Sequence, residues 1–206
     1  MGSGWAAFAI ATWLVLLLNL ALSLRMVRYL RSRQRAERLD ALRESMSELA
    51  IGEPAPEFRA RDLAGRPVRL ADYRDRETAF VFVSPHCGPC ARELPGLAKL
   101  APLARDGASA ELVLVSDSNT PETNAWFSAI GEEHPEVEGF RLLVAPTSQT
   151  DFLARYNPRG LTPYFLHFDA EGRVTARGGL RSPHWAAIVR RWEGGTNPAR
   201  VLRRYV

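Results

Sequence analysis

The sequence predicts an α/β layer fold preceded by one N-terminal transmembrane helix. Two observations carry this prediction: residues 52–195 alternate between strand-like and helix-like segments, and residues 5–24 form an apolar run without a charged side chain. Alternation of this kind is typical of a sheet covered by helices. The length of 206 residues suits about one domain with a short appendage.

The composition excludes several other classes of protein. With 46% hydrophobic and 24% charged residues, the chain can build a core and is unlike a disordered chain. Its two cysteines are too few for a disulfide-stapled mini-fold or a four-cysteine zinc site. The net charge of +4 is small, and no basic patch with interleaved aromatic residues is present. We therefore expect no metal, no cofactor and no nucleic-acid partner.

The start of the chain predicts a retained membrane anchor over residues 5–24. A helix of about 20 apolar residues spans the hydrocarbon core of a bilayer, and only Thr12, Asn19 and Ser23 interrupt this run with polar side chains. Residues 1–4 are a short uncharged tail, whereas a cleaved signal peptide has a charged start and a shorter apolar core. We therefore expect a single-pass protein of the cell membrane that contacts the lipid bilayer through this run.

Residues 25–50 predict an Arg-rich juxtamembrane helix or linker, since the segment contains neither Gly nor Pro. Seven arginines lie between Arg25 and Arg43, and none precedes the apolar run. Arginines flank transmembrane helices mainly on the cytoplasmic side, so this distribution favours a cytoplasmic body. Gly52, Pro54 and the residues around them end the helix and mark a domain boundary.

Strands in the body are indicated by apolar runs between turn residues. Residues 78–83 (TAFVFV) and 111–116 (ELVLVS) are nearly continuous apolar runs, as in strands buried on both faces. The other predicted strands are residues 68–70 after the turn at Gly65, residues 140–145, and residues 164–169 and 173–177, which form a hairpin around Gly172.

Helices are indicated between these strands by apolar residues at helical spacing. Residues 90–104 place Leu94, Leu97 and Ala98 on one face. The other predicted helices are residues 121–133, with Thr120 as candidate N-cap and Pro121 in the first turn, residues 148–156, and residues 183–193. The body is expected to extend over residues 51–194, followed by a tail over residues 195–206.

Both cysteines of the chain, Cys87 and Cys90, lie three positions apart between a predicted buried strand and a predicted helix. A disulfide that closes so short a loop adds little stability, so the spacing favours a redox-active pair. At a helix N-terminus, free N–H groups and the helix dipole favour a thiolate. Cys87 is therefore the predicted exposed nucleophile, and Cys90, one turn into the helix, is the predicted resolving cysteine. Pro89 fixes the backbone at the helix start, and Gly88 lets a partner chain approach.

Residues 83–95 (VSPHCGPCARELP) resemble the active-site helix of thioredoxin-like proteins, and Glu93 and Pro95 match its form in the membrane-anchored TlpA and ResA branch. Residues 51–58 (IGEPAPEF), followed by Asp62-Leu63-Ala64-Gly65, are similar to the start of that domain. The resemblance implies a thioredoxin-like fold with a central mixed sheet flanked by helices. It also implies that Thr162 and Pro163 form a cis-proline loop against the redox-active Cys87–Cys90 disulfide.

Two neighbours of the cysteines differ from the usual thioredoxin pattern. His86 stands where thioredoxins usually have Trp; a protonated His86 would stabilise the Cys87 thiolate, and a solvent-facing loop histidine is the alternative interpretation. Val81 stands where thioredoxins often have a buried Asp, so Glu93 is a candidate replacement as acid relay for Cys90, or else an exposed helix residue.

The leading hypothesis is a membrane-tethered thiol–disulfide oxidoreductase that acts on protein thiols or disulfides and exchanges electrons with an unidentified donor or acceptor. The order of the segments is also similar to the MauD family of methylamine-utilisation proteins, which implies the alternative of a dedicated maturation factor for one exported client. A peroxiredoxin-like peroxidase is a minor alternative, because Phe80 stands where the peroxidase pattern has Pro. The family resemblance implies an extracytoplasmic domain, which we prefer to the cytoplasmic placement that the arginines favour.

Overall fold

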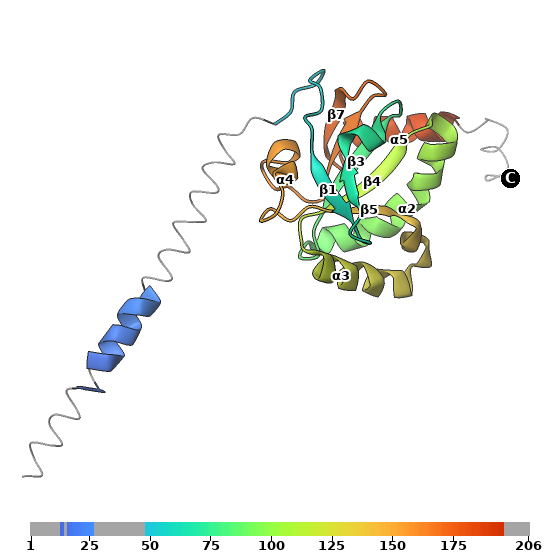
Figure 1. Ribbon diagram of the computed structural model, residues 1–206. Coiled ribbons are helices and arrows are strands. Elements are labelled where there is room, and N and C mark those ends of the chain that lie inside the picture. Colours follow the sequence, from blue (N-terminus) through green and yellow to red (C-terminus); the bar gives the residue numbers. More distant parts are fainter. Residues whose placement is uncertain (1–12, 15, 27–47, 196–206) are drawn as a thin grey trace, which may run out of the picture. The chain divides into compact units, whose positions relative to one another are not determined.

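The computed structural model describes residues 13–14, 16–26 and 48–195 (Figure 1). The chain divides into two units, residues 1–45 and 46–206, and each is treated by itself. In the first unit the described residues are α-helical. Within the described residues, no helix is both long enough and apolar enough to cross a membrane. The predicted anchor lies partly, and the predicted linker and C-terminal tail mostly, outside these residues.

Within residues 48–195, seven strands form one mixed sheet (Figure 1). The strands are β1 (Arg59–Asp62), β2 (Pro67–Arg69), β3 (Thr78–Val83), β4 (Glu111–Ser116), β5 (Arg141–Val144), β6 (Tyr164–Phe168) and β7 (Val174–Gly179). Their order is β2-β1-β5-β4-β3-β6-β7. Strands β3, β4 and β5 are parallel, and every other neighbouring pair is antiparallel.

Helices connect the parallel strands, because a parallel pair requires a crossover. The helices are α2 (Gly88–Ala108), α3 (Thr120–Glu133), α4 (Phe152–Tyr156) and α5 (Pro183–Gly195), with 3₁₀ helices η1 (Leu70–Tyr73) and η2 (Pro135–Gly139). Helix α2 joins β3 to β4, and α3 with η2 joins β4 to β5. Val83 pairs with Ser116, so β3 and β4 end together and the loops after them share one edge of the sheet.

The central strand β3 separates two hydrophobic cores, because successive side chains of a strand point to opposite faces. Ala79, Val81 and Val83 lie in the core that includes buried residues of α2 and α5. Phe80 and Phe82 lie in a second core, rich in aromatic rings, that includes the residues of α4. Helix α4 is thus on the opposite face of the sheet from α2 and α5 (Figure 1).

Most predicted elements are confirmed, including β3 and β4 with their predicted ends. The N-cap predicted for α3 is wrong: the cap is Asn119, whose Oδ1 accepts the Glu122 N–H at 3.0 Å, and Thr120 is the first helical residue. The helix predicted over residues 148–156 begins only at Phe152. Before it, the chain turns, and the Thr150 hydroxyl accepts the Phe152 N–H at 3.2 Å.

A buried histidine on β6 is held by its neighbours in the neutral form. The pKa of His167 is lowered from 6.5 to about 4, chiefly by burial and also by the adjacent Arg191 guanidinium. The Thr175 hydroxyl donates to the His167 carbonyl at 3.3 Å, so the His167 Nδ1–H donates to that hydroxyl. Arg191 Nη2 lies 3.3 Å from His167 Nε2 and 2.8 Å from a Glu77 carboxylate oxygen. The ion pair of Glu77 is therefore with Arg191.

The low pKa of His167 predicts a loss of stability in mild acid. Between pH 6.5 and about 4 the unfolded chain binds a proton at this histidine and the folded chain does not. The free energy of unfolding should therefore fall by at most about 3 kcal/mol as the pH drops through this window. Above the window, the stability that the neutral His167 contributes is complete. Chemical denaturation at pH 7.5 and 4.5 measures the change. His167→Gln should flatten the dependence, and His134→Gln, at a half-exposed histidine, should not; an equal dependence on pH in all three proteins would contradict the prediction.

Candidate active site

The loop between β3 and α2 carries both cysteines. Strand β3 ends at Val83, and α2 begins at Gly88, with Cys87 as its N-cap. Cys87 and Cys90 are joined by a disulfide, with their Cα atoms 5.3 Å apart. Cys87 is partly exposed, whereas Cys90 is fully buried in the core between the sheet and the helices. A partner can therefore reach the sulfur of Cys87 and not that of Cys90.

The start of α2 directs a hydrogen-bond donor at the accessible sulfur. The N–H of Cys90 donates to Cys87 Sγ at 3.3 Å, and Pro89, which has no N–H, occupies the first turn. The first N–H groups of a helix have no partner within it and carry the positive end of its dipole. After reduction, a thiolate at Cys87 would accept this hydrogen bond and be stabilised relative to the thiol.

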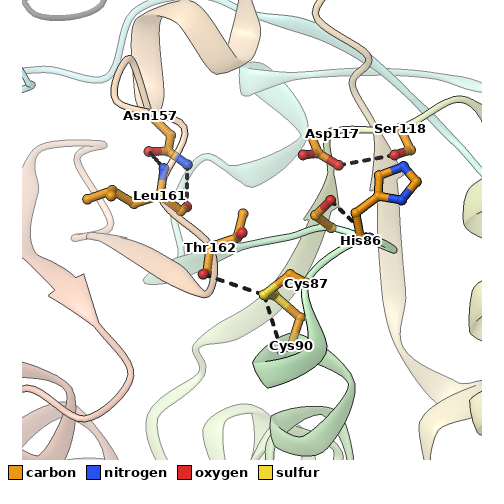
Figure 2. The surroundings of a disulfide bond; sticks show 9 residues. His86, Cys87, Cys90, Asp117, Ser118, Asn157, Leu161 and Thr162 are labelled. Carbon is orange, nitrogen blue, oxygen red and sulfur yellow. Dashed lines mark hydrogen bonds between the residues drawn. A yellow bond between two sulfur atoms is a disulfide. The ribbon is translucent and has the colours of Figure 1, made fainter. Parts of the chain in front are cut away.

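A second loop, remote in sequence, lies against the same sulfur. The Thr162–Pro163 peptide bond is cis and directly precedes β6, which pairs with β3. The Thr162 carbonyl oxygen lies 3.5 Å from Cys87 Sγ (Figure 2). Since a disulfide sulfur carries no proton, this is a contact in the oxidised protein. The residues that the resemblance assigned to a cis-proline loop are thus beside the cysteine pair.

Asn157 fixes the shape of this loop, and the sequence reasoning missed it. Its buried side chain makes two hydrogen bonds with the backbone of Leu161 (Figure 2). Nδ2 donates to the Leu161 carbonyl at 2.7 Å, and Oδ1 accepts the Leu161 N–H at 3.0 Å. The signal in the sequence was the Asn157-Pro158 pair, since Asn before Pro favours a turn. The two hydrogen bonds hold Leu161 in place next to Thr162, the residue that contacts Cys87.

Replacing Asn157 with Asp should weaken the loop. One carboxylate oxygen would then face the Leu161 carbonyl, so a hydrogen bond becomes a repulsion between two acceptors. We expect a loss of about 1–3 kcal/mol in the free energy of unfolding. The rate of reaction with a protein disulfide should fall as well. Chemical denaturation and a single-turnover exchange assay measure the two effects, and Asn119→Asp, a substitution of one good N-cap by another, is the control. Equal stability of both variants would contradict the role.

His86 and Glu93 are both held by partners other than the cysteines. His86 is exposed; its Nε2 lies 2.9 Å from Glu122 Oε1 at the start of α3, and its ring lies toward Asp117 and Ser118, away from Cys87 (Figure 2). Glu93 on α2 lies 3.2 Å from Arg181 Nη2. Their predicted roles therefore remain predictions, and the structure shows the Glu122 carboxylate beside His86 and the Arg181 guanidinium beside Glu93.

The remaining predicted site residues lie at the mouth of the site. Gly88 and Pro89 are exposed at the start of α2. A Cβ atom at position 88 would meet only Arg92 Nη1 within 4 Å, at 3.7 Å, so the surface there is open. Val81, at the place where thioredoxins often have Asp, is fully buried on β3.

A disulfide at the start of a helix, following a central strand and packed against a cis-proline loop, defines a thioredoxin-like thiol–disulfide oxidoreductase. The Redoxin family matches residues 50–190, and the chain belongs to that family.

Two relatives and one solved structure are similar to this chain. The chain is 31% identical over 127 residues to thiol-disulfide oxidoreductase ResA of Geobacillus thermodenitrificans, covering 61% of this chain and 67% of that protein. It is 32% identical over 133 residues to methylamine utilization protein MauD of Paracoccus denitrificans, covering 62% of this chain but only 58% of that protein. A putative protein disulfide isomerase from Bacteroides thetaiotaomicron shares the fold with a TM-score of 0.59 at 24% identity, over 72% of this chain and 92% of that structure.

Proposed function

We propose that the protein is a membrane-tethered oxidoreductase that exchanges disulfides with protein substrates through Cys87-Gly88-Pro89-Cys90. The observation that carries this proposal is the asymmetry of the pair. Cys87 Sγ is reachable and receives an N–H hydrogen bond, whereas Cys90 is fully buried. An exposed, stabilised sulfur attacks, and a shielded one can only attack its neighbour.

The reaction is a balanced transfer of two electrons. In the reducing direction, the Cys87 thiolate attacks one sulfur of a substrate disulfide, forms a mixed disulfide and releases the other substrate sulfur as a thiolate. The Cys90 thiolate then attacks Cys87 Sγ, which releases the second substrate thiolate and forms the disulfide of this structure. The two released thiolates take up the protons that the enzyme cysteines lost. A thiol reductant must restore the pair, and with a dithiol substrate the same steps run backwards as an oxidation.

The Gly-Pro dipeptide between the cysteines favours the reducing direction, because it resembles that of reducing thioredoxins. The test is reduction of insulin by the full-length, detergent-solubilised protein with dithiothreitol as electron source. A general reductase accelerates insulin precipitation well above dithiothreitol alone. No acceleration would contradict the general activity.

Similarity to MauD supports a second candidate, a maturation factor dedicated to one client. Such a protein would act slowly on insulin. A Cys90→Ala variant expressed in its own cells would instead hold a single partner as a mixed disulfide, released by reductant. A broad set of trapped partners would favour the general oxidoreductase.

Tethering rests on the uncharged apolar run at residues 5–24, and we propose that the redox domain is extracytoplasmic. The test is labelling of Cys87 and Cys90 in intact cells with a membrane-impermeant maleimide after reduction by a permeant reagent. Labelling without lysis supports the proposal. Labelling only after lysis would place the domain in the cytoplasm, and recovery in the soluble fraction would contradict the tether.

A further inference from the structure

A groove of about 440 Å³ adjoins the cis-proline loop. Its lining includes Glu48, Arg159, Leu161, Thr162, Pro163 and Arg177. The groove lies beside the reacting atoms, because Thr162, one of its lining residues, contacts Cys87 Sγ through its carbonyl oxygen. A polypeptide whose sulfur reaches Cys87 and whose chain crosses the cis-proline loop therefore passes next to this groove.

Two guanidinium groups in the groove share a single carboxylate. Glu48, from the segment preceding the sheet, lies 3.3 Å from Arg159 Nη1 and 3.0 Å from Arg177 Nη1. Arg177 also donates to the Leu49 carbonyl at 2.8 Å, so it is anchored to that segment. The Arg159 side chain is 61% exposed, against 32% for Arg177 and 22% for Glu48. The three groups together carry one excess positive charge, and Arg159 presents it to solvent.

Two carboxylates lie on the other side of Cys87 from the groove. Asp117 and Glu122 lie on the side of His86, whereas Leu161 and Thr162 lie across the sulfur from them (Figure 2). The excess positive charge of the groove therefore favours a negatively charged client residue on the groove side of Cys87. Complementary potentials of this kind set specificity and association rate more than total affinity.

We propose that Arg159 and Arg177 bind an acidic side chain of the client polypeptide, close in sequence to its target cysteine, and that Glu48 occupies this position in the free protein. This inference rests on the proposed exchange of disulfides with protein substrates. The exposed apolar edge at Leu161, which is 39% exposed, adds a contact for the rest of the client chain. Glu48 is a competitor within the same chain, so the groove selects acidic clients without leaving its arginines unpaired in their absence.

The experiment uses three short peptides, each with one cysteine in a mixed disulfide with thionitrobenzoate. They differ only in the residues flanking the cysteine, which are Glu, Gln or Lys. Release of the coloured thiolate, in a single turnover, gives the second-order rate constant for reaction of each peptide with the full-length reduced protein in detergent. We expect the Glu peptide to react on the order of 3- to 5-fold faster than the Gln peptide, as for an exposed charge pair, and the Lys peptide to react more slowly.

Variants of the groove separate binding from folding. Arg159 is exposed and bonds Glu48, and Arg159→Gln should remove most of the preference for the Glu peptide over the Gln peptide. Glu48→Gln should increase the preference, because it removes the competing carboxylate. Arg66→Gln, which removes the same charge from the exposed β1–β2 turn, is the matched control and should keep the preference. High salt should reduce the preference in the wild type.

The outcomes distinguish the two proposals. Reaction with all three peptides at equal rates, or a preference that survives Arg159→Gln, would overturn the acidic-client inference and leave the oxidoreductase intact. A preference lost equally in Arg66→Gln would show a general charge effect and would also overturn it. No reaction with any peptide, and none with insulin, would overturn the proposed function itself and with it this inference.

Discussion

Replacing Cys87 with Ser should reduce the rate of disulfide exchange by roughly a thousandfold or more, because a serine hydroxyl is not ionised near neutral pH and cannot form a mixed disulfide. Cys87 is the accessible cysteine of the pair, and its sulfur accepts a hydrogen bond from the Cys90 N–H. Single-turnover reaction of the reduced protein with a peptide disulfide measures the loss.

Cys90→Ser is the matched variant, since it removes the other sulfur of the same pair. This protein should complete the first attack at nearly the normal rate and then stop, so a mixed disulfide through Cys87 accumulates and is visible by mass spectrometry. Accumulation of a mixed disulfide through Cys90 in the Cys87→Ser protein would reverse the assigned roles. Such a result is not expected, because Cys90 is fully buried.

Phe80→Ala should destabilise the fold more than any other single change considered for this chain, by about 3–5 kcal/mol in the free energy of unfolding. The Phe80 ring is fully buried in the middle of β3, where its nearest aromatic neighbours are Tyr73 at 5.2 Å and Phe58 and Phe152 at 5.6 Å between ring centroids. Its removal leaves a cavity between the sheet and α4.

Guanidinium denaturation of the variant and the wild type gives the difference in stability. Ile51→Ala is the control, because the Ile51 side chain is 60% exposed and should change the stability by less than about 0.5 kcal/mol. A loss below about 1 kcal/mol for Phe80→Ala would contradict the view that the aromatic rings around β3 form a tightly packed core.

The sequence was sufficient where the determining interactions are local. The runs 78–83 and 111–116 predicted β3 and β4 to the residue, because continuous apolar segments become strands when both faces of a sheet are covered. The Cys87–Cys90 spacing at a strand-to-helix junction likewise located the candidate site. The N-cap of α3 was misassigned for an equally local reason: Asn119 and Thr120 are both good caps, and the choice depends on which backbone N–H the side chain meets.

Only the tertiary structure decided which distant groups meet. The Thr162 carbonyl reaches Cys87 across 75 residues, and Glu48 reaches Arg159 across 111. Strand order sets these contacts, because the antiparallel pairing of β6 with β3 brings the cis-proline loop to the sulfur. The partner of His86 is likewise a property of the fold, since His86 lies in the loop before α2 and Glu122 lies on α3. Periodicity encodes which face of an element is buried; the packing of whole elements determines what that face touches.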